Sequence, residues 1–516
     1  MSDKLESVAE LQEAKKNITT QMNHAKKNVL FIMVDQVIAN ILGSYGGICQ
    51  TPNIDNLSKE GVTFDNAYTP LSICSPARAS IFTGKLPHRH GILYNTTTQP
   101  YGKSEIDDEK NVITHYLLNA GYKCGYIGKW HIGVNKGPRE YGFEGTKCAG
   151  YGWPDFVEDY DEFLKEQGHS GLNAIKARNL IGEENFSEQS SLLISETTKR
   201  LLSGGNLYAG IIDLPTNLTE SGFVANRTIE LLKKYKDKPF FITAAFWGPH
   251  HPALSSPEFA GKHNPENIQE WKNFYDDLSN KPRIQKKYIK YLHKRLSAGG
   301  WKLWQKIIAA HFDSMSMIDF QIGKILNELK NLGLDKNTVV IFTSDHGDTL
   351  GCHGGLWDKG PYMYEETYKV PLIVRSGENI VKNRCSAFAS NMDIFSTILD
   401  ICGVSQPQDI DSYSLLPIIE GKQEKVRKNV TSQFYGFDRR GMHFQNMIRF
   451  ENCKYIFTPS DIDELYDLKN DPYELNNLID NPEYIEILKE LKLQLYQEMK
   501  NSKNPFADSS YELMGL

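Results

Sequence analysis

The feature that most constrains the fold of this chain is a series of short, continuous apolar runs separated by segments of helical pattern. The runs have strand length, and they cover Val29–Val34, Lys123–Gly128, Phe240–Phe246, Thr338–Thr343 and Val370–Val374. An uninterrupted apolar strand is typical of a parallel sheet that helices cover on both faces. The pattern therefore predicts an α/β fold built on a mostly parallel sheet between helices.

Helical patterns occur between and after these runs. They cover Asn111–Ala120, Leu303–Asn331 and Asp393–Cys402. From about Val426 the pattern changes, and short strand-like pieces precede a last helix at Glu483–Lys500. We expect this end of the chain to form a smaller α+β domain with an antiparallel sheet.

The 516 residues are enough for two or three domains. The expected division is a polar N-terminal extension at 1–27, a catalytic domain at 28–425 and a C-terminal α+β subdomain at 426–516. Within the catalytic domain, residues 151–226 are polar and weakly periodic. They indicate an insertion that carries specificity loops.

Composition and charge exclude several classes of partner. The formal net charge is -6, so we expect no nucleic-acid partner and no membrane partner. No run reaches the roughly 18 apolar residues of a spanning helix, and the polar first residues lack the apolar core of a signal peptide. A cytoplasmic location is expected. The 8 cysteines form no CxxC pair, which favours free thiols.

Polar side chains follow four of the predicted strands, at the points where those strands end. Ligands of an open parallel sheet bind outside the carboxyl ends of its strands, so these side chains are expected to share one site. They are Asp35 and Gln36, Lys129 and His131, His250 and His251, and Asp345 and His346. One such pair is more often a cap or a loop, but four pairs indicate a site.

Two of these pairs have the chemistry of metal ligands. Asp35, Gln36, Asp345 and His346 offer three oxygen ligands and one imidazole. Oxygen-rich sites favour Ca²⁺ or Mg²⁺, and the imidazole leaves Mn²⁺ open.

The sharpest motif is CSPARASIFTG, which begins at Cys74. Pro76 suits the first turn of a helix, which would place Cys74 at the helix N-terminus, where unpaired N–H groups attract an anion. Local chemistry leaves two interpretations open. Cys74 is either a buried capping residue or a reactive thiol.

This motif resembles the Cys-x-Pro-x-Arg signature of the formylglycine-dependent sulfatases, with Ala77 where serine is the most frequent family residue. Other family-like elements follow in family order between Asn28 and about Leu478. They are GKWHIG from Gly128, PHHP from Pro249, SDHG from Ser344, LWDK from Leu356 and ELYDL from Glu464. The matches cover most of the chain and are specific as a set.

The resemblance implies an alkaline-phosphatase-like core, with a smaller C-terminal domain, that releases inorganic sulfate from a sulfate ester. It implies that a maturation enzyme oxidises Cys74 to formylglycine, which hydrates to a gem-diol. The diol would hold one divalent cation together with four side chains, those of Asp35, Gln36, Asp345 and His346. Ca²⁺ is expected first, with Mn²⁺ and Mg²⁺ as alternatives. Many family members have Asp in place of Gln36 and Asn in place of His346.

The resemblance also assigns catalytic roles to Cys74, Arg78, Lys129, His131, His250 and Lys359. Arg78 and Lys129 would steady the diol. Lys359 and His250 would bind the sulfate, with His250 protonating the departing alcohol. His131 would take a proton from the second hydroxyl.

The substrate and the reaction class keep alternatives. Polar and aromatic loops such as Tyr151-Gly152-Trp153 favour a sulfated carbohydrate over choline sulfate. A phosphonate monoester or phosphodiester hydrolase could use the same nucleophile, because both ester types are tetrahedral with anionic oxygens. A non-catalytic, metal-bound binding protein is the alternative from another class, and it requires Cys74 to stay unmodified.

Overall fold

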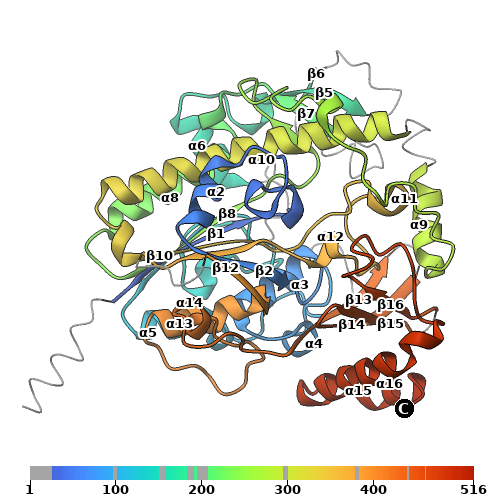
Figure 1. Cartoon of the computed structure of the whole chain (residues 1–516). Helices are drawn as coiled ribbons and strands as arrows, with labels where there is room; N and C mark the ends of the chain where they lie inside the picture. The colour runs from blue at the N-terminus through green and yellow to red at the C-terminus, as the bar shows by residue number, and fades with distance from the viewer. Residues whose placement is uncertain are drawn as a thin grey trace, which may run out of the picture.

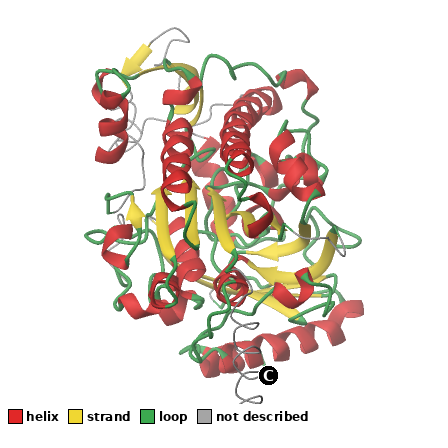
Figure 2. Ribbon diagram, turned by 90° about the vertical axis from the view of Figure 1, so that its left-hand side faces the viewer, coloured by secondary structure: helices red, strands yellow, loops and turns green. Residues whose placement is uncertain are grey.

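The computed structural model of the chain describes residues 26–96, 102–149, 157–182, 191–193, 207–293, 300–377, 383–438, 441–459 and 461–516. Most of the expected N-terminal extension and the segment Tyr151–Trp153 lie outside the described residues. Helices cover both faces of a large central sheet, and a second sheet lies beside it near the C-terminus (Figure 1 and Figure 2). Among the described helices, none is long and apolar enough to cross a membrane.

The central sheet has 8 strands in the order β12-β2-β11-β10-β1-β8-β3-β4. Their bounds are Arg384–Ser390, Val62–Tyr68, Leu372–Arg375, Thr338–Ser344, Asn28–Val34, Phe240–Phe246, Lys123–Gly128 and Glu144–Gly145, in that order. Adjacent strands run parallel except at β11, which is antiparallel to both of its neighbours. The predicted mostly parallel sheet is confirmed.

Strand β1 shows why the predicted apolar runs are continuous. Leu30 and Ile32 pack into the layer that contains helices α2, α8 and α10, whereas Phe31 and Met33 pack into the layer that contains α3, α5 and α13. Figure 1 shows these two groups of helices on opposite faces of the sheet. The bounds are Pro52–Lys59 for α2, Glu220–Tyr235 for α8, Gly300–Asn331 for α10, Cys74–Thr83 for α3, Ile113–Asn119 for α5 and Ile394–Ile401 for α13.

Residues of the interval 151–226 form structure that the weak periodicity of the sequence did not predict. Strands β5 (Lys176–Gly182), β6 (Ser191–Leu193) and β7 (Leu207–Ile212) join β9 (Ala253–Ser255) in a separate 4-stranded sheet. Helix α6 (Glu158–Glu166) precedes them in the chain. This small sheet lies over α10, away from the central sheet (Figure 1).

The C-terminal region forms the predicted antiparallel sheet. Strands β13 (Asn429–Asp438), β14 (Gly441–Phe450), β15 (Cys453–Phe457) and β16 (Glu464–Asp467) form an antiparallel sheet. One face of this sheet packs on aromatic side chains that include Tyr68, Tyr362 and Tyr368, and the other face packs on helix α15 (Ile485–Asn501).

The remaining helices are short. Their bounds are Pro87–His90 for α4, Arg283–His293 for α9, Cys352–Gly355 for α11, Glu365–Tyr368 for α12, Leu416–Ile419 for α14 and Ala507–Leu513 for α16.

Candidate active site

Two carboxylates meet at the edge of the central sheet because of strand register. Strands β1 and β10 pair in parallel with Val34 opposite Ser344, so the next residues, Asp35 and Asp345, leave the sheet side by side. Both side chains are fully buried. Asn391 donates hydrogen bonds to the backbone carbonyls of Ser344 and Asp345, at 3.2 and 3.0 Å, which holds the end of β10 in place.

Cys74 joins this pair from the first position of helix α3. Its Sγ lies 3.1 Å from His346 Nε2, 3.8 Å from Lys129 Nζ and 3.9 Å from Asp35 Oδ1. Sequence reasoning left a capping cysteine and a reactive thiol open. The sulfur is surrounded by charged and ligating atoms rather than sealed in apolar packing, and Ile73, at the N-cap position, makes no side-chain cap.

Asp35, Cys74, Asp345 and His346 each direct one ligand-type atom into a common space. These atoms lie within 4.8 Å of one another, and all four residues are buried. The set offers two carboxylate oxygens, an imidazole nitrogen and the sulfur of Cys74. Such spacing fits one cation.

Arg78 lies one helical turn beyond Cys74 and joins both carboxylates from the other side. Its Nε is 2.7 Å from Asp345 Oδ2, and its Nη2 is 2.9 Å from Asp35 Oδ2. Lys129 Nζ also contacts Asp35 Oδ2, at 2.7 Å. Arg78 and Lys129 therefore use the Oδ2 atoms, whereas Asp35 Oδ1 faces Cys74 and His346.

The charges set the protonation of this group. Burial alone would raise the pKa of Asp35, but the charges of Lys129 and Arg78 hold that pKa well below its usual range. Burial would lower the pKa of His346, but Asp345 and Cys74 raise it to about 9. A cation bound by His346 Nε2 would compete with that proton, so cation binding here would release protons.

A second group lies beside the first and contains Lys359, His250 and Gln36. Lys359 Nζ donates to Gln36 Oε1 at 2.7 Å and lies 3.3 Å from His250 Nε2. His250 Nδ1 lies 2.8 Å from the carbonyl oxygen of His251, which acts as an acceptor. This bond places the ring proton on Nδ1, so Nε2 is the atom that faces Lys359.

The two histidines assigned to proton transfer are both held neutral. Burial and the charge of Lys359 keep the pKa of His250 well below its ordinary value. Burial and the charge of Lys129 do the same for the pKa of His131. A neutral imidazole can accept a proton, and a bound anion beside His250 would raise its pKa and favour the acid form.

Three residues of the site have a backbone conformation that is unusual for residues other than glycine. Gln36, His131 and Asp358 have φ values of 65°, 56° and 68°, in the left-handed region that non-glycine residues rarely adopt. Such conformations cost about 1–3 kcal/mol each and persist only where the surroundings impose them.

Sequence reasoning missed two carboxylates next to Gln36. Asp348 Oδ2 accepts from Gln36 Nε2 at 2.5 Å, and Asp358 Oδ1 accepts from the same atom at 3.0 Å. His251 Nδ1 lies 3.4 Å from that atom. The sequence could have indicated Asp348, because it stands only three residues after Asp345, in the same loop.

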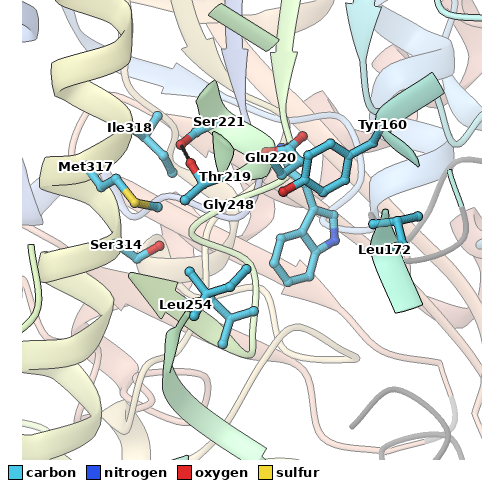
Figure 3. A pocket seen from close by; sticks show the side chains of 12 residues that line it. Tyr160, Leu172, Thr219, Glu220, Ser221, Gly248, Leu254, Ser314, Met317 and Ile318 are labelled. Carbon is cyan, nitrogen blue, oxygen red and sulfur yellow. Dashed lines mark hydrogen bonds between the residues drawn. The ribbon is translucent and has the colours of Figure 1, made fainter. Parts of the chain in front are cut away.

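One cavity near the site is a packing feature. It has a volume of about 40 Å³ and lies between α10, β9 and the start of α8 (Figure 3). Trp247 and Gly248 line it, but none of the predicted site residues does. It has room for about three water molecules, which is too little for a sugar ring.

Comparison with known proteins agrees with this geometry. Residues 27–404 match the family model Sulfatase, and residues 351–501 match the model N-sulphoglucosamine sulphohydrolase, C-terminal. The chain is 27% identical to the N-acetylglucosamine-6-O-sulfatase of Bacteroides thetaiotaomicron, over 93% of this chain and 87% of that protein.

Two solved structures share the fold. BT4656, in complex with its substrate D-glucosamine-2-N,6-O-disulfate, has a TM-score of 0.71 at 24% identity and covers 94% of this chain and 99% of that one. The phosphonate monoester hydrolase of Agrobacterium radiobacter has a TM-score of 0.72 at 21% identity and covers 92% and 96%.

The first family model spans well over half of the chain, and the architecture and the strand-end site agree with it. The protein belongs to the sulfatase family, within the alkaline-phosphatase-like superfamily. It is an enzyme of that family, a sulfuric ester hydrolase.

Proposed function

We propose that this sulfatase removes sulfate from a sulfated carbohydrate, with a nucleophile made by oxidising Cys74 to formylglycine. The observation that carries the proposal is the position of the Cys74 side chain. It lies at the N-terminus of α3, within hydrogen-bond range of His346 and close to Asp35 and Lys129. A separate maturation enzyme would perform the oxidation.

The ligand set fits a divalent cation. Asp35, Asp345 and His346, together with the hydrated form of residue 74, would hold it, and the carboxamide oxygen of Gln36 would complete the set. The cation would polarise the sulfate oxygens and favour the ionised nucleophile. Hard carboxylate and carboxamide ligands favour Ca²⁺, and the imidazole keeps Mn²⁺ and Mg²⁺ as alternatives.

The side chains around this position would divide the remaining work. Arg78 and Lys129 would hold the hydrated residue 74 and balance its charge. Lys359 Nζ and His250 Nε2, which are 3.3 Å apart, would bind sulfate oxygens. Fixed cations in a buried site stabilise the charge that develops during the reaction.

Proton transfer would begin from two neutral imidazoles. One hydroxyl of the hydrated residue 74, ionised with its proton released to solvent, would be the nucleophile at sulfur. The bound anionic ester would raise the pKa of His250, so Nε2 would take up a proton from solvent and give it to the departing alcohol oxygen. The second hydroxyl must lose its proton for the aldehyde to re-form and sulfate to leave. His131 would accept that proton.

A carbohydrate is the substrate class favoured by the relatives. The N-acetylglucosamine-6-O-sulfatase aligns along nearly the whole chain. We propose that the interval 151–226 within the catalytic domain 28–425 and the region 426–516 supply the residues that choose among sugars. Phosphonate monoester hydrolysis remains the alternative for the same nucleophile, since an enzyme of that name shares the fold.

The test combines mass spectrometry with turnover. The tryptic peptide that ends at Arg78 should show formylglycine at position 74 in enzyme purified from cells that contain a maturation enzyme. Cys74→Ala should reduce sulfate release on the order of 10⁴–10⁶-fold, as loss of a nucleophile does. Retained turnover by Cys74→Ala would refute the nucleophile assignment.

Substrate class is tested on the same preparation. Sulfated mono- and disaccharides, choline sulfate and a phenylphosphonate ester are compared by kcat/KM. The proposal expects a sulfated sugar to have the highest value. A higher value for the phosphonate ester would replace the proposed reaction with the alternative.

A further inference from the structure

We propose that Asp348 is a positioning residue that sets the orientation of the Gln36 carboxamide and so presents its oxygen to the active site. Asp348 is 1% exposed and contacts no group assigned to the reaction except Gln36. This inference rests on the proposed function, because it takes Gln36 Oε1 to face the bound cation and Lys359.

The two ends of the Gln36 carboxamide meet opposite kinds of neighbour. Nε2 donates to Asp348 Oδ2 at 2.5 Å and to Asp358 Oδ1 at 3.0 Å. Oε1 accepts from Lys359 Nζ at 2.7 Å. Turning the amide over would place Oε1 against two carboxylates and Nε2 against an ammonium, so the observed orientation is the one that the charges permit.

Asp348 is better placed than Asp358 to impose this orientation. Its Oδ1 accepts the backbone N–H of Leu350 at 2.7 Å and that of Asp358 at 3.1 Å, so the carboxylate cannot rotate without losing both bonds. The side chain of Asp358 is 28% exposed, and its Oδ1 also accepts from Lys359. Solvent can replace part of its role.

The same bonds connect Gln36 to the loop that carries Lys359. Asp348 follows β10, and its bonds to Leu350 and Asp358 close that loop onto itself. Gln36 is the neighbour of Asp35, at the end of β1. Asp348 therefore fixes the position of Gln36, in the proposed cation site, relative to the loop that carries Lys359, in the proposed sulfate site.

Asp348→Asn tests the orientation directly. The two backbone N–H donors keep a carbonyl oxygen at the Oδ1 position, so the new NH₂ group must face Gln36 Nε2, donor against donor. Gln36 must then turn its oxygen toward the new amide and away from Lys359. We expect a loss of about 10–100-fold in both Ca²⁺ affinity and kcat/KM, as for other residues that orient ligands.

Gln36→Glu in the Asp348→Asn background supplies the matching rescue. One oxygen of the introduced carboxylate accepts from the new NH₂ group, and the other faces Lys359. The single variant Gln36→Glu instead places a carboxylate against Asp348. The pair should be strongly non-additive, with the double variant better than either single variant.

Asp313→Asn is the matched control. Asp313 is also a buried carboxylate that accepts two backbone N–H groups, from Gly261 and His263, and one side chain, but it lies on α10. Ca²⁺ affinity is measured by calorimetry on chelator-treated enzyme, separately from turnover. The control should keep wild-type Ca²⁺ affinity.

The outcomes separate the two proposals. Wild-type Ca²⁺ binding by Asp348→Asn, or a double variant no better than the worse single variant, overturns the positioning role. If Asp348→Asn does not fold, restored folding and Ca²⁺ binding in the double variant support the role, and their absence overturns it. If the wild-type enzyme hydrolyses no sulfate ester but the Ca²⁺ data follow the expected pattern, the proposed function fails and the positioning role stands.

Discussion

Among the described residues three groups have the spacing of a metal site, and two of these clusters differ in how their charges are met. The first, at the ends of β1 and β10, contains Asp35, Cys74, Asp345 and His346. The second, beside the C-terminal sheet, contains His353, Glu366 and Glu474. In the first cluster Arg78 and Lys129 bind the Oδ2 atoms, while Asp35 Oδ1 faces the common space.

In the second cluster the charges are paired by protein groups. Lys454 Nζ lies 2.5 Å from Glu474 Oε1 and 3.0 Å from Glu365 Oε1. His353 Nδ1 is 3.0 Å from Asp276 Oδ2, and its ring stacks on a tyrosine. These contacts join the loop after Lys359 to the C-terminal sheet. The comparison teaches that buried carboxylates and a histidine mark a reaction site only where some of their lone pairs are left for a ligand.

After Cys74→Ala, the largest expected effect is a loss of turnover without a loss of stability. His250→Gln should lower sulfate-ester turnover about 10²–10⁴-fold, because it removes the proposed acid, and should change the melting temperature little. His115→Gln, on the outer helix α5, is the control and should match the wild type. Full turnover by His250→Gln would remove this residue from the mechanism.

A variant in the second cluster should show the opposite pattern, a loss of stability without a loss of turnover. Lys454→Met leaves two buried carboxylates without their cation and should lower the free energy of unfolding by about 3–5 kcal/mol. The kcat of the folded fraction should stay within about twofold of wild type. Lys489→Met removes an exposed pair with Glu486 and should cost less than about 1 kcal/mol. Equal denaturation midpoints for the two variants would contradict the structural role.

Cation binding should distinguish the clusters by thermal unfolding. At about 100 times its dissociation constant, Ca²⁺ should stabilise the wild type by about 2.7 kcal/mol. Asp345→Asn should abolish this gain, whereas His353→Gln should keep it. The opposite result would move the cation site to the cluster of His353, Glu366 and Glu474.

The smallest effect is a pH dependence of stability. Burial raises the pKa of Glu474 to about 7, despite the nearby charge of Lys454. A raised acid pKa means that its stabilising contribution is present below about pH 4.5 and is lost as the pH rises toward 7. This contribution has a slope of at most about 1.4 kcal/mol per pH unit. Glu474→Gln should reduce the measured slope between pH 5 and 7, whereas Glu486→Gln, on the surface, should not.

Local pattern predicted much of the fold. The central strands β1, β3, β8 and β10 were found within one residue, because strands buried on both faces leave continuous apolar runs. The expected strand Val370–Val374 is shifted to Leu372–Arg375 and is antiparallel. Strand β2, with the sequence VTFDNAY, was missed because its polar residues interrupt the apolar pattern.

The small sheet that includes strands of the interval 151–226 was also missed, and its pairing explains why. Strand β7 pairs with β9, which lies beyond α8 and β8 in the chain. The local periodicity of a sequence cannot predict which of two such distant segments will pair. The orientation of Gln36 was not predictable either, since its partners Asp348 and Asp358 come from a loop more than 300 positions away.

The sequence alone determined which residue types stand at the ends of the strands and at the start of α3. Those positions follow from local apolar pattern and from the helix-starting Pro76, which short-range physics controls. Only the tertiary structure decided which oxygen of each carboxylate meets a side-chain cation, which way Gln36 faces, and which of two similar clusters keeps room for a ligand. These outcomes depend on the register between strands and on charges brought together from distant segments, and no single stretch of sequence contains that information.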